Sequence, residues 1–337
     1  MYPKAPLFIV TARGGDGRLH AIAPFYLSDL RLMGLLRYRC LRPVGDCHCG
    51  AEYPDLIVRT GCEQPAMAAV ADALAKAANT WDCIWIRNVA GWSGAVQRLR
   101  AALGSGSCYW HTRRRGFSAI QLPRTYEQYL RSLSGSFRSN ISRQDKSLRS
   151  KHCVKLRRCR SPQELPDLLE ALFALHRKRW ESVNQAGSFV RRPAMERFYR
   201  RFAPEALRLG RLRVAALEVD GTIRAVQYGY VYGKRFYQLQ EGFDTDGASG
   251  AGNVLRARVI AACIEEGLTE YDFLGGFDEH KRHWRARQRW GADVLVGSDA
   301  GKNRLLFLRQ LWPTGRFVQQ GRPANQVRCR NQAPVSN

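Results

Sequence analysis

The sequence reads Gly247-Ala248-Ser249-Gly250-Ala251-Gly252 between a stretch typical of β-strands and a stretch typical of a helix. Before it, residues 212–243 hold three runs rich in β-branched and aromatic side chains, which predicts a three-strand antiparallel meander. After it, Leu255, Val259 and Cys263 are evenly spaced, as in a helix that packs one face on a sheet. Small residues at the amino end of a helix let backbone amides approach a phosphate closely. The stretch therefore predicts an α/β fold with a pyrophosphate site at this loop.

Other glycine-rich motifs fit the surrounding sequence less well. A dinucleotide-binding loop needs a parallel βαβ unit and an acidic residue about twenty positions later. A Walker loop needs Gly-Lys-Ser or Gly-Lys-Thr, which this loop does not contain. The run from Gly247 to Ala251 nearly matches the nucleophile elbow G-x-S-x-G, but it ends in alanine and follows a meander. A plain strand-to-helix connection without a ligand stays open as the alternative.

The order of predicted elements divides the chain into two halves. The first half is predicted to hold a hairpin over residues 7–27, strands over 55–58, 81–89 and 117–122, and helices over 65–79 and 93–103. The second half is predicted to hold helices over 162–182, 193–207, 253–266 and 279–286, the meander, and strands over 271–274 and 292–297.

Both halves contain a strand of the pattern aromatic-Asp-apolar, at Trp81-Asp82-Cys83-Ile84 and at Tyr271-Asp272-Phe273-Leu274. This similarity predicts a duplicated domain. The first half begins directly on its hairpin, without the strand and helices that open the second, which predicts an exposed sheet edge or an incomplete first core. Whether residue 1 is the natural start stays open.

The composition is that of a globular protein with a large excess of positive charge. The 337 residues are enough for about two domains, and the formal net charge is +25. No apolar run approaches the roughly 18 residues of a membrane span, so we predict a cytoplasmic chain without a transmembrane segment. Ten scattered cysteines favour reduced thiols. Cys47-His48-Cys49 does not match a paired zinc motif, so we predict no metal.

The positive charge is clustered, which indicates an anionic partner. Residues 137–160 hold nine Lys or Arg against Asp145 alone, and residues 302–330 hold seven without an acid. Such clusters attract nucleic acid, anionic lipid or phosphorylated cofactors, and they also occur as solvated surfaces. The polar, Pro- and Gly-rich residues 313–337 are predicted to form a basic disordered tail.

Four motifs carry a resemblance to a known family. They are Glu241-Gly242-Phe243-Asp244, Gly252-Asn253-Val254-Leu255, Tyr271-Asp272-Phe273-Leu274-Gly275-Gly276 and Lys281-Arg282-His283-Trp284. With the meander and the loop, they resemble GNAT-fold acyltransferases, and more narrowly the CelD-like, FemAB-related tandem GNAT group. The resemblance implies α/β (α+β) GNAT-like domains over residues 1–124 and 125–312, each a mixed, mostly antiparallel sheet flanked by helices. It also implies acetyl-CoA or another acyl-CoA as co-substrate and a cell-envelope, exopolysaccharide or cellulose-related acceptor.

The resemblance suggests roles for individual residues. The GNAT phosphate loop has Arg or Gln where this chain has Gly247, so a side-chain contact is lost that Arg256 or Arg258 would have to replace. We expect Glu241, Asp272 or Lys281 to serve catalysis, with Glu241 or another group as the base, and Arg179, Trp180 and Trp284 to contact the acceptor. The expected cofactor-binding set is Phe243, Gly250, Ala251, Gly252, Asn253, Val254 and Arg256.

Two other functions stay open. A FemAB-like aminoacyl transferase would take its donor from aminoacyl-tRNA, with residues 137–160 along the RNA backbone. A non-catalytic module would keep the basic surface but not the chemistry, consistent with glycine at position 247.

Overall fold

The computed structural model describes residues 5–32, 36–46, 50–103, 108–246 and 248–298. The strands are β1 (Leu7–Arg13), β2 (Leu19–Leu32), β3 (Leu36–Pro43), β4 (Ile57–Val58), β5 (Cys83–Val89), β6 (Cys108–Gln121), β7 (Val154–Arg158), β8 (Leu212–Val219), β9 (Thr222–Tyr232), β10 (Arg235–Phe243), β11 (Glu270–Gly275) and β12 (Arg287–Ser298). The helices are α1 (Glu63–Lys76), α2 (Ala95–Leu103), α3 (Tyr126–Ser132), α4 (Gly135–Lys151), α5 (Leu165–Glu181), α6 (Ser188–Arg191), α7 (Ala194–Arg208), α8 (Ala251–Glu265) and α9 (Glu279–His283), with a 3-10 turn at Pro162–Glu164.

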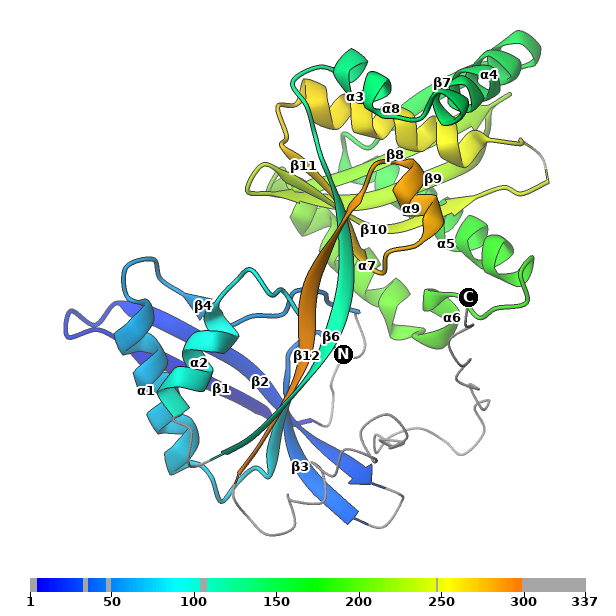
Figure 1. Ribbon diagram of the computed structural model, residues 1–337. Helices are drawn as coiled ribbons and strands as arrows, with labels where there is room; N and C mark the ends of the chain where they lie inside the picture. Colours follow the sequence, from blue (N-terminus) through cyan, green and yellow to red (C-terminus); the bar gives the residue numbers. More distant parts are fainter. Residues whose placement is uncertain (1–4, 33–35, 47–49, 104–107, 247, 299–337) are drawn as a thin grey trace, which may run out of the picture.

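The strands form one continuous mixed sheet. Its order is β1-β2-β3-β5-β12-β6-β11-β10-β9-β8-β7, and β4 pairs with β2 beside this path. Figure 1 shows the sheet running through both halves of the molecule, with helices against it in each half. The predicted mixed, mostly antiparallel α/β fold is confirmed.

In the first half, α1 and α2 cover one face of β1, β2 and β5. The core there is apolar and includes Phe25, Met67, Leu74, Ile84 and Leu99. The predicted hairpin, helices and strands of this half are present. The prediction missed β3, which pairs antiparallel with β2 and parallel with β5. The sequence of β3 mixes Arg with apolar residues and has no clear strand pattern. The segment forms a strand because it pairs with a neighbour on each side.

In the second half, the meander β8-β9-β10 lies between two layers of helices. The first core joins α3, α4 and α8 to the sheet and includes Tyr129, Ile141 and Val254. The second core joins α5 and α7 to it and includes Leu172 and Tyr199. The basic stretch from residue 137 turns out to be mostly helix: α4 turns Ile141 inward and leaves Arg and Lys on its outer side.

The two halves exchange their last strands. Strand β6 belongs to the first half in sequence but pairs with β11 of the second, and β12 belongs to the second half but pairs with β5 of the first. The two long strands also pair with each other along all of β12, from Arg287 opposite Ala119 to Ser298 opposite Cys108. The division at residues 124 and 125 stays a prediction, and β6 and β12 cross it in space.

Three sequence-based expectations concern the chain as a whole. Among the described residues, no helix is long and apolar enough to cross a membrane. The cysteines found as free thiols in the described ranges are Cys40, Cys62, Cys83, Cys153, Cys159 and Cys263. The motif Cys47-His48-Cys49, Gly247 and the predicted tail at 313–337 lie outside the described residues.

Candidate functional site

The site begins where β10 and β11 separate. These parallel strands pair only from Arg235 opposite Glu270 to Tyr237 opposite Asp272, and beyond that point they diverge. Helix α8 starts at the end of the loop that leaves β10, and α9 follows β11. The diverging strand ends and the two helices therefore bring side chains from four elements to one place.

A buried ion network occupies this place. Arg256 of α8 is 3% exposed and donates through Nη2 to Glu241 Oε2. Arg179 of α5 donates through Nη1 to Glu241 Oε1 at 3.1 Å, and Gln238 Nε2 donates to Oε2 at 2.9 Å. Burial alone would raise the pKa of Glu241, but Arg256 and Arg179 outweigh it and lower this pKa to about 2. Glu241 is therefore a carboxylate at neutral pH and a weak proton acceptor.

A polar cavity of about 320 Å³ opens beside this network. Its walls come from α5, β10, α8, β11 and α9, and the lining residues include Arg179, Trp180, Gln238, Leu239, Glu241, Arg256, Phe273, Gly275, His280 and Lys281. Five predicted site residues thus line one cavity: Arg179, Trp180, Glu241, Arg256 and Lys281.

The polar side chains that line this cavity are mainly hydrogen-bond donors and not proton acceptors. Arg256 Nη1 lies 2.9 Å from His280 Nε2, and burial, followed by the charge of Arg256, lowers the pKa of His280 to about 4. A neutral imidazole that accepts at Nε2 carries its proton on Nδ1, so His280 is a donor there. Lys281 Nζ donates to Gly275 O at 2.5 Å and Gly276 O at 3.2 Å, and burial lowers its pKa. Such groups suit a carbonyl oxygen that gains negative charge.

The glycine loop leads into the start of α8, as predicted. Gly250 and Gly252 pack against neighbouring side chains. Gly250 caps α8 with φ of 87°, and a Cβ there would lie 2.6 Å from the Gln144 side chain. A Cβ on Gly252 would lie 2.9 Å from the Phe243 ring. The packing of Gln144 and Phe243 is therefore enough to explain why these two positions are glycine.

The amides of this helix start are only partly available. Ala251 N donates to Ala248 O, and Val254 N donates to Gly250 O. The first turn leaves the amides of Gly252 and Asn253 without a partner inside the helix. Within α8, the amides of Gly252 and Asn253 are therefore the ones available to bind phosphate.

Several predicted residues lie outside the cavity wall. Ala251 and Val254 are buried in the core, and Asn253 donates to Gln144 Oε1 at 3.2 Å. Phe243 packs under Arg179, whose Cζ lies 4.6 Å from the ring centroid. None of these four residues lines the cavity.

Two predictions need correction on physical grounds. Trp284 is 0% exposed and packs edge-on against Phe137, so it is a core residue and cannot form an acceptor wall. Asp272 is 1% exposed and accepts from Arg289, Tyr53 and the amide of Leu274, so its oxygens are used in holding the fold.

The structure adds first-half residues that the sequence did not suggest. Tyr53 donates to Asp272 Oδ1 at 3.1 Å, across 219 positions of sequence. Its neighbour Glu52 accepts from the amide of Gly275, next to Lys281. Since Glu52 and Tyr53 follow an irregular segment with no motif, the sequence carried no signal for them.

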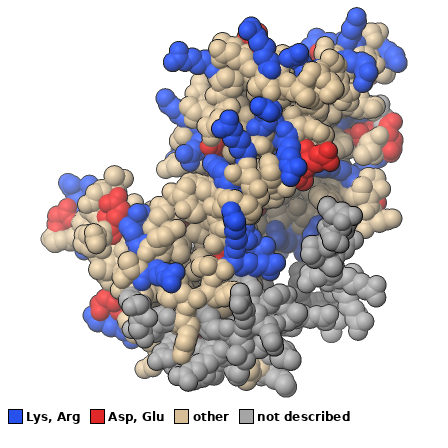
Figure 2. Space-filling view, in the orientation of Figure 1, with Lys and Arg blue, Asp and Glu red and all other residues tan. Residues whose placement is uncertain are grey.

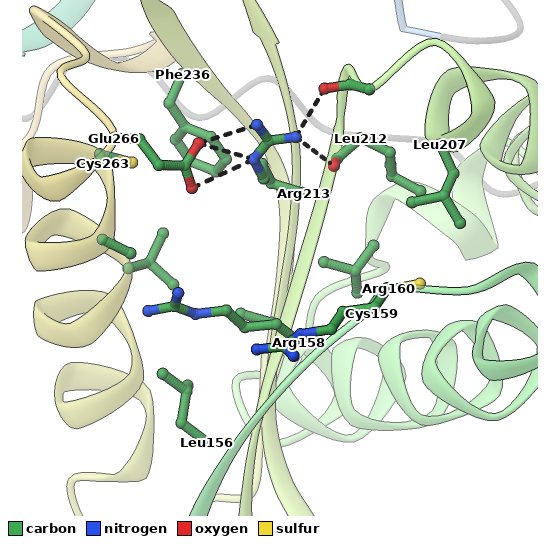
Figure 3. Close-up of a pocket in the computed structure, with 15 residues that line it drawn as sticks. Leu156, Arg158, Cys159, Arg160, Leu207, Leu212, Arg213, Phe236, Cys263 and Glu266 are labelled. Carbon is green, nitrogen blue, oxygen red and sulfur yellow. Dashed lines mark hydrogen bonds and ion pairs between the residues drawn. The ribbon is translucent and has the colours of Figure 1, made fainter.

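A second cavity lies at the far end of α8. Figure 3 shows this space of about 410 Å³, where Arg213 binds Glu266 and the carbonyls of Gly210 and Leu212. Arg158 and Arg160 extend along its edge (Figure 3). It shares no lining residue with the polar cavity.

Metal chemistry has no support among the described residues. No group of three or more His, Cys, Asp or Glu in the described ranges could hold a metal ion.

The fold and the site together define a class of protein. A meander, a glycine loop that starts a helix, and a parallel strand that diverges from the meander are the parts of a GNAT domain. Residues 135–282 match the acetyltransferase (GNAT) domain family, and the chain carries this domain. This match confirms the resemblance to the GNAT acyltransferase family. The likeness to FemX is one of fold.

Solved structures agree on the fold over most of the chain. The crystal structure of FemX has a TM-score of 0.60 at 12% identity, covering 89% of this chain and 90% of that chain. L-PGS from Bacillus licheniformis has a TM-score of 0.53 at 11% identity, covering 91% and 90%. A conserved protein of unknown function from Bacteroides thetaiotaomicron has a TM-score of 0.54 at 15% identity, covering 82% and 86%. No match to the sequence was found among curated proteins.

GNAT folds typically use an acyl-CoA, and the residues here fit its pyrophosphate at the backbone. The amides of Gly252 and Asn253 and the positive end of the α8 dipole would hold it. The two α8 cations considered as replacements for the missing Arg or Gln are already bound, Arg256 by Glu241 and Arg258 by Asp145 at 2.6 Å. The fit therefore rests on amides and on the helix dipole.

Proposed function

We propose that this protein is an acyl-CoA-dependent N- or O-acyltransferase that works at the polar cavity. The observation that carries the proposal is the position of this cavity, which lies where β10 and β11 diverge and is lined by Arg256 of α8. A donor bound at the start of α8 would enter the gap between the strands and bring its thioester toward the cavity.

The cavity residues then have separate roles. Arg179, Lys281 and the Nδ1–H of His280 would stabilise negative charge on the carbonyl oxygen as the acceptor attacks. Glu241 would hold Arg256 and Arg179 in position, because its low pKa makes it a weak base. Trp180, which donates to His176 Nε2 at 3.0 Å, would form a wall for the acceptor.

The proposed acceptor is a cell-envelope or exopolysaccharide- or cellulose-related precursor, and the proposed setting is the cytoplasm. This part rests on the CelD-like resemblance. Acetyl-CoA is the donor to test first, because it is the smallest acyl-CoA of this class.

Acetyl-CoA binding tests the proposal directly. We expect acetyl-CoA to raise the melting temperature of the wild type, since a ligand of the native state stabilises it. Asn253→Asp adds a negative charge at the α8 amino end with almost no change of shape, so we expect binding about tenfold weaker or worse. Calorimetric titration measures both proteins.

The matched control is Asn184→Asp, on an exposed turn after α5, which should bind like the wild type. Absence of wild-type binding at millimolar acetyl-CoA would contradict the proposal. If Asn253→Asp binds acetyl-CoA as tightly as the wild type does, the phosphates do not bind at the start of α8.

A second candidate is transfer of an aminoacyl group from tRNA, favoured by one observation. Arg138, Arg143, Lys146 and Arg149 lie exposed on α4, which packs beside α8. Figure 2 shows Lys and Arg side chains over this upper part of the molecule. Binding of tRNA that weakens steeply with added salt would support this candidate, and binding that is absent or insensitive to salt would exclude it.

A further inference from the structure

A large apolar cavity lies between the two halves of the chain, separate from the charged network. Its volume is about 740 Å³. The lining residues are Val44, Gly45, Gly50, Ala51, Glu52 and Tyr53 from the first half, and Phe198, Phe202, Ala206, Leu209, Arg211, Tyr230, Val231, Tyr232, Tyr237, Leu239 and Leu274 from the second. The second-half walls come from α7, β9, β10 and β11.

The mouth of this cavity exposes apolar side chains to water. Val44, Phe202, Leu209 and Tyr232 are 40%, 39%, 46% and 64% exposed. Exposed apolar side chains that gather at one concave place are typical of a binding site, whereas single ones are ordinary. Most of the surface offered is aliphatic or aromatic, so the occupant must be mainly apolar.

One charged side chain among the lining residues of this cavity, Glu52, has a carboxylate oxygen without a hydrogen-bond partner among the described residues. Glu52 accepts from the amide of Gly275, yet its Oε2 is out of contact with solvent and has no hydrogen-bond partner among the described residues. A buried carboxylate oxygen without a donor is costly, by about 1 to 3 kcal/mol or more. A ligand that brings a donor to this oxygen would remove that cost.

The charges around Glu52 set the kind of donor that fits. Lys281 and Arg192 favour its ionised form and Asp272 opposes it, but burial is the largest influence and raises the pKa of Glu52 to about 7. Lys281 Nζ itself donates to the carbonyls of Gly275 and Gly276. Glu52 is thus half-ionised near neutral pH, and a cationic donor would complete its ionisation.

We propose that this cavity binds a molecule with an elongated apolar body and a primary amino group, and that the amino group donates to Oε2 of Glu52. The apolar body lies against Phe202, Leu209 and Leu239.

The site adjoins the polar cavity. Leu239 lines both cavities, and Gly275, whose amide binds Glu52, lines the polar one. The amino group of a bound ligand would thus lie next to the proposed acyl-transfer site. The assignment of this amino group as the acyl acceptor rests on the proposed function. The binding of the amine to the apolar cavity does not depend on it.

Calorimetric titration of the full chain with octylamine, octan-1-ol and octanoate, at about pH 8, tests the binding. We expect octylamine to bind at least about tenfold more tightly than octanoate, because the Glu52 carboxylate attracts one and repels the other. Glu52→Gln keeps the shape and should weaken octylamine about tenfold while leaving octan-1-ol within about threefold. Glu205→Gln, on the exposed side of α7, is the matched control and should bind like the wild type.

A second variant tests the apolar wall without touching Glu52. Leu209→Gln places a neutral polar group at the cavity mouth on an exposed position, so it should fold and should weaken octylamine and octan-1-ol alike. Octylamine affinity should also rise about tenfold between about pH 6 and about pH 8 in the wild type, as Glu52 ionises, and stay flat in Glu52→Gln.

Several results would overturn the proposal. They are octylamine binding that Glu52→Gln leaves unchanged, equal affinity for the three probes, and no octylamine binding at all. If octylamine binds as expected and acetyl-CoA does not, the cavity proposal stands and the acyltransferase proposal fails. The reverse result overturns only the cavity proposal.

Discussion

The two halves of the sheet repeat one arrangement and differ in what fills it. Strands β1 to β3, helix α1 and strand β5 correspond in order to β8 to β10, α8 and β11, and in each half the third strand runs parallel to the strand after the helix. In the first half this seam, the line where β3 meets β5, holds the apolar groups Leu30, Tyr38, Cys40, Cys83 and Leu295. Beside them a local buried ion pair joins Arg42 to Asp46 at 2.6 Å, and no polar cavity opens from it among those described. In the second half the seam holds Gln238, Glu241, Arg256 and Tyr271, and it opens to a polar cavity.

The repeated aspartate shows which part of the pattern belongs to the fold. Asp82 accepts from the amide and guanidinium of Arg39 on the neighbouring strand. Asp272 accepts from the guanidinium of Arg289 on a nearby strand. Both carboxylates are almost fully buried. Asp82 makes the same kind of contact in the half that lacks the polar cavity. The carboxylate at this position therefore stabilises the fold, which argues against a catalytic role for Asp272.

The largest expected effect comes from breaking the charged seam. Arg256→Ala leaves Glu241 buried with a weaker set of partners, so we expect a loss of about 3 to 5 kcal/mol in the free energy of unfolding. Urea denaturation measures it. Arg258→Ala removes a less buried pair with Asp145 and should cost about 1 kcal/mol or less.

The double variant Glu241→Leu with Arg256→Met replaces the ion pair between β10 and α8 by two apolar side chains. Replacing both partners of a buried pair is often neutral, so its stability should lie within about 2 kcal/mol of the wild type. Acyl transfer should be lost. A double variant as unstable as Arg256→Ala would show that the seam needs charge in order to fold.

A pH experiment tests a buried histidine of the second half. Burial, followed by Arg179, lowers the pKa of His176 from 6.5 to about 4. The unfolded chain therefore binds this proton more readily, and stability falls as the pH drops from 6.5 toward 4, by about 2 to 3 kcal/mol at most.

Melting temperatures measured across this pH range should show a shallower slope for His176→Gln. Gln185→Asn, on the exposed turn after α5, neither adds nor removes a titrating group and should keep the wild-type slope. If both variants keep the wild-type slope, His176 is not the group responsible.

The smallest expected effect compares the glycines before the two corresponding helices. Gly61 and Gly250 both have positive φ, at 83° and 87°, but a Cβ on Gly61 meets no atom within 4 Å, whereas one on Gly250 meets Gln144. Gly61→Ala should cost about 1 kcal/mol from backbone strain alone, and Gly250→Ala about 1 kcal/mol more. Equal losses in urea denaturation would mean that Gln144 moves aside freely.

The sequence determined a good part of the fold. Period-two strands, glycine turns and the four-residue spacing on α8 fixed the meander, the helix after it and the mixed sheet, because these signals are local. The motif around Tyr271 and the loop before α8 identified the GNAT domain. Glu241 and Lys281 could be selected from sequence because they lie in the motifs that carry the resemblance.

The tertiary structure decided what those residues can do. Glu241 became a weak base only because Arg256 and Arg179, on two different helices, converge on it. Trp284 proved to be core because α4 covers it. The exchange of β6 and β12 brought Glu52 beside Gly275, and the pKa of such a group depends on burial and neighbouring charges, which are properties of contacts between distant segments.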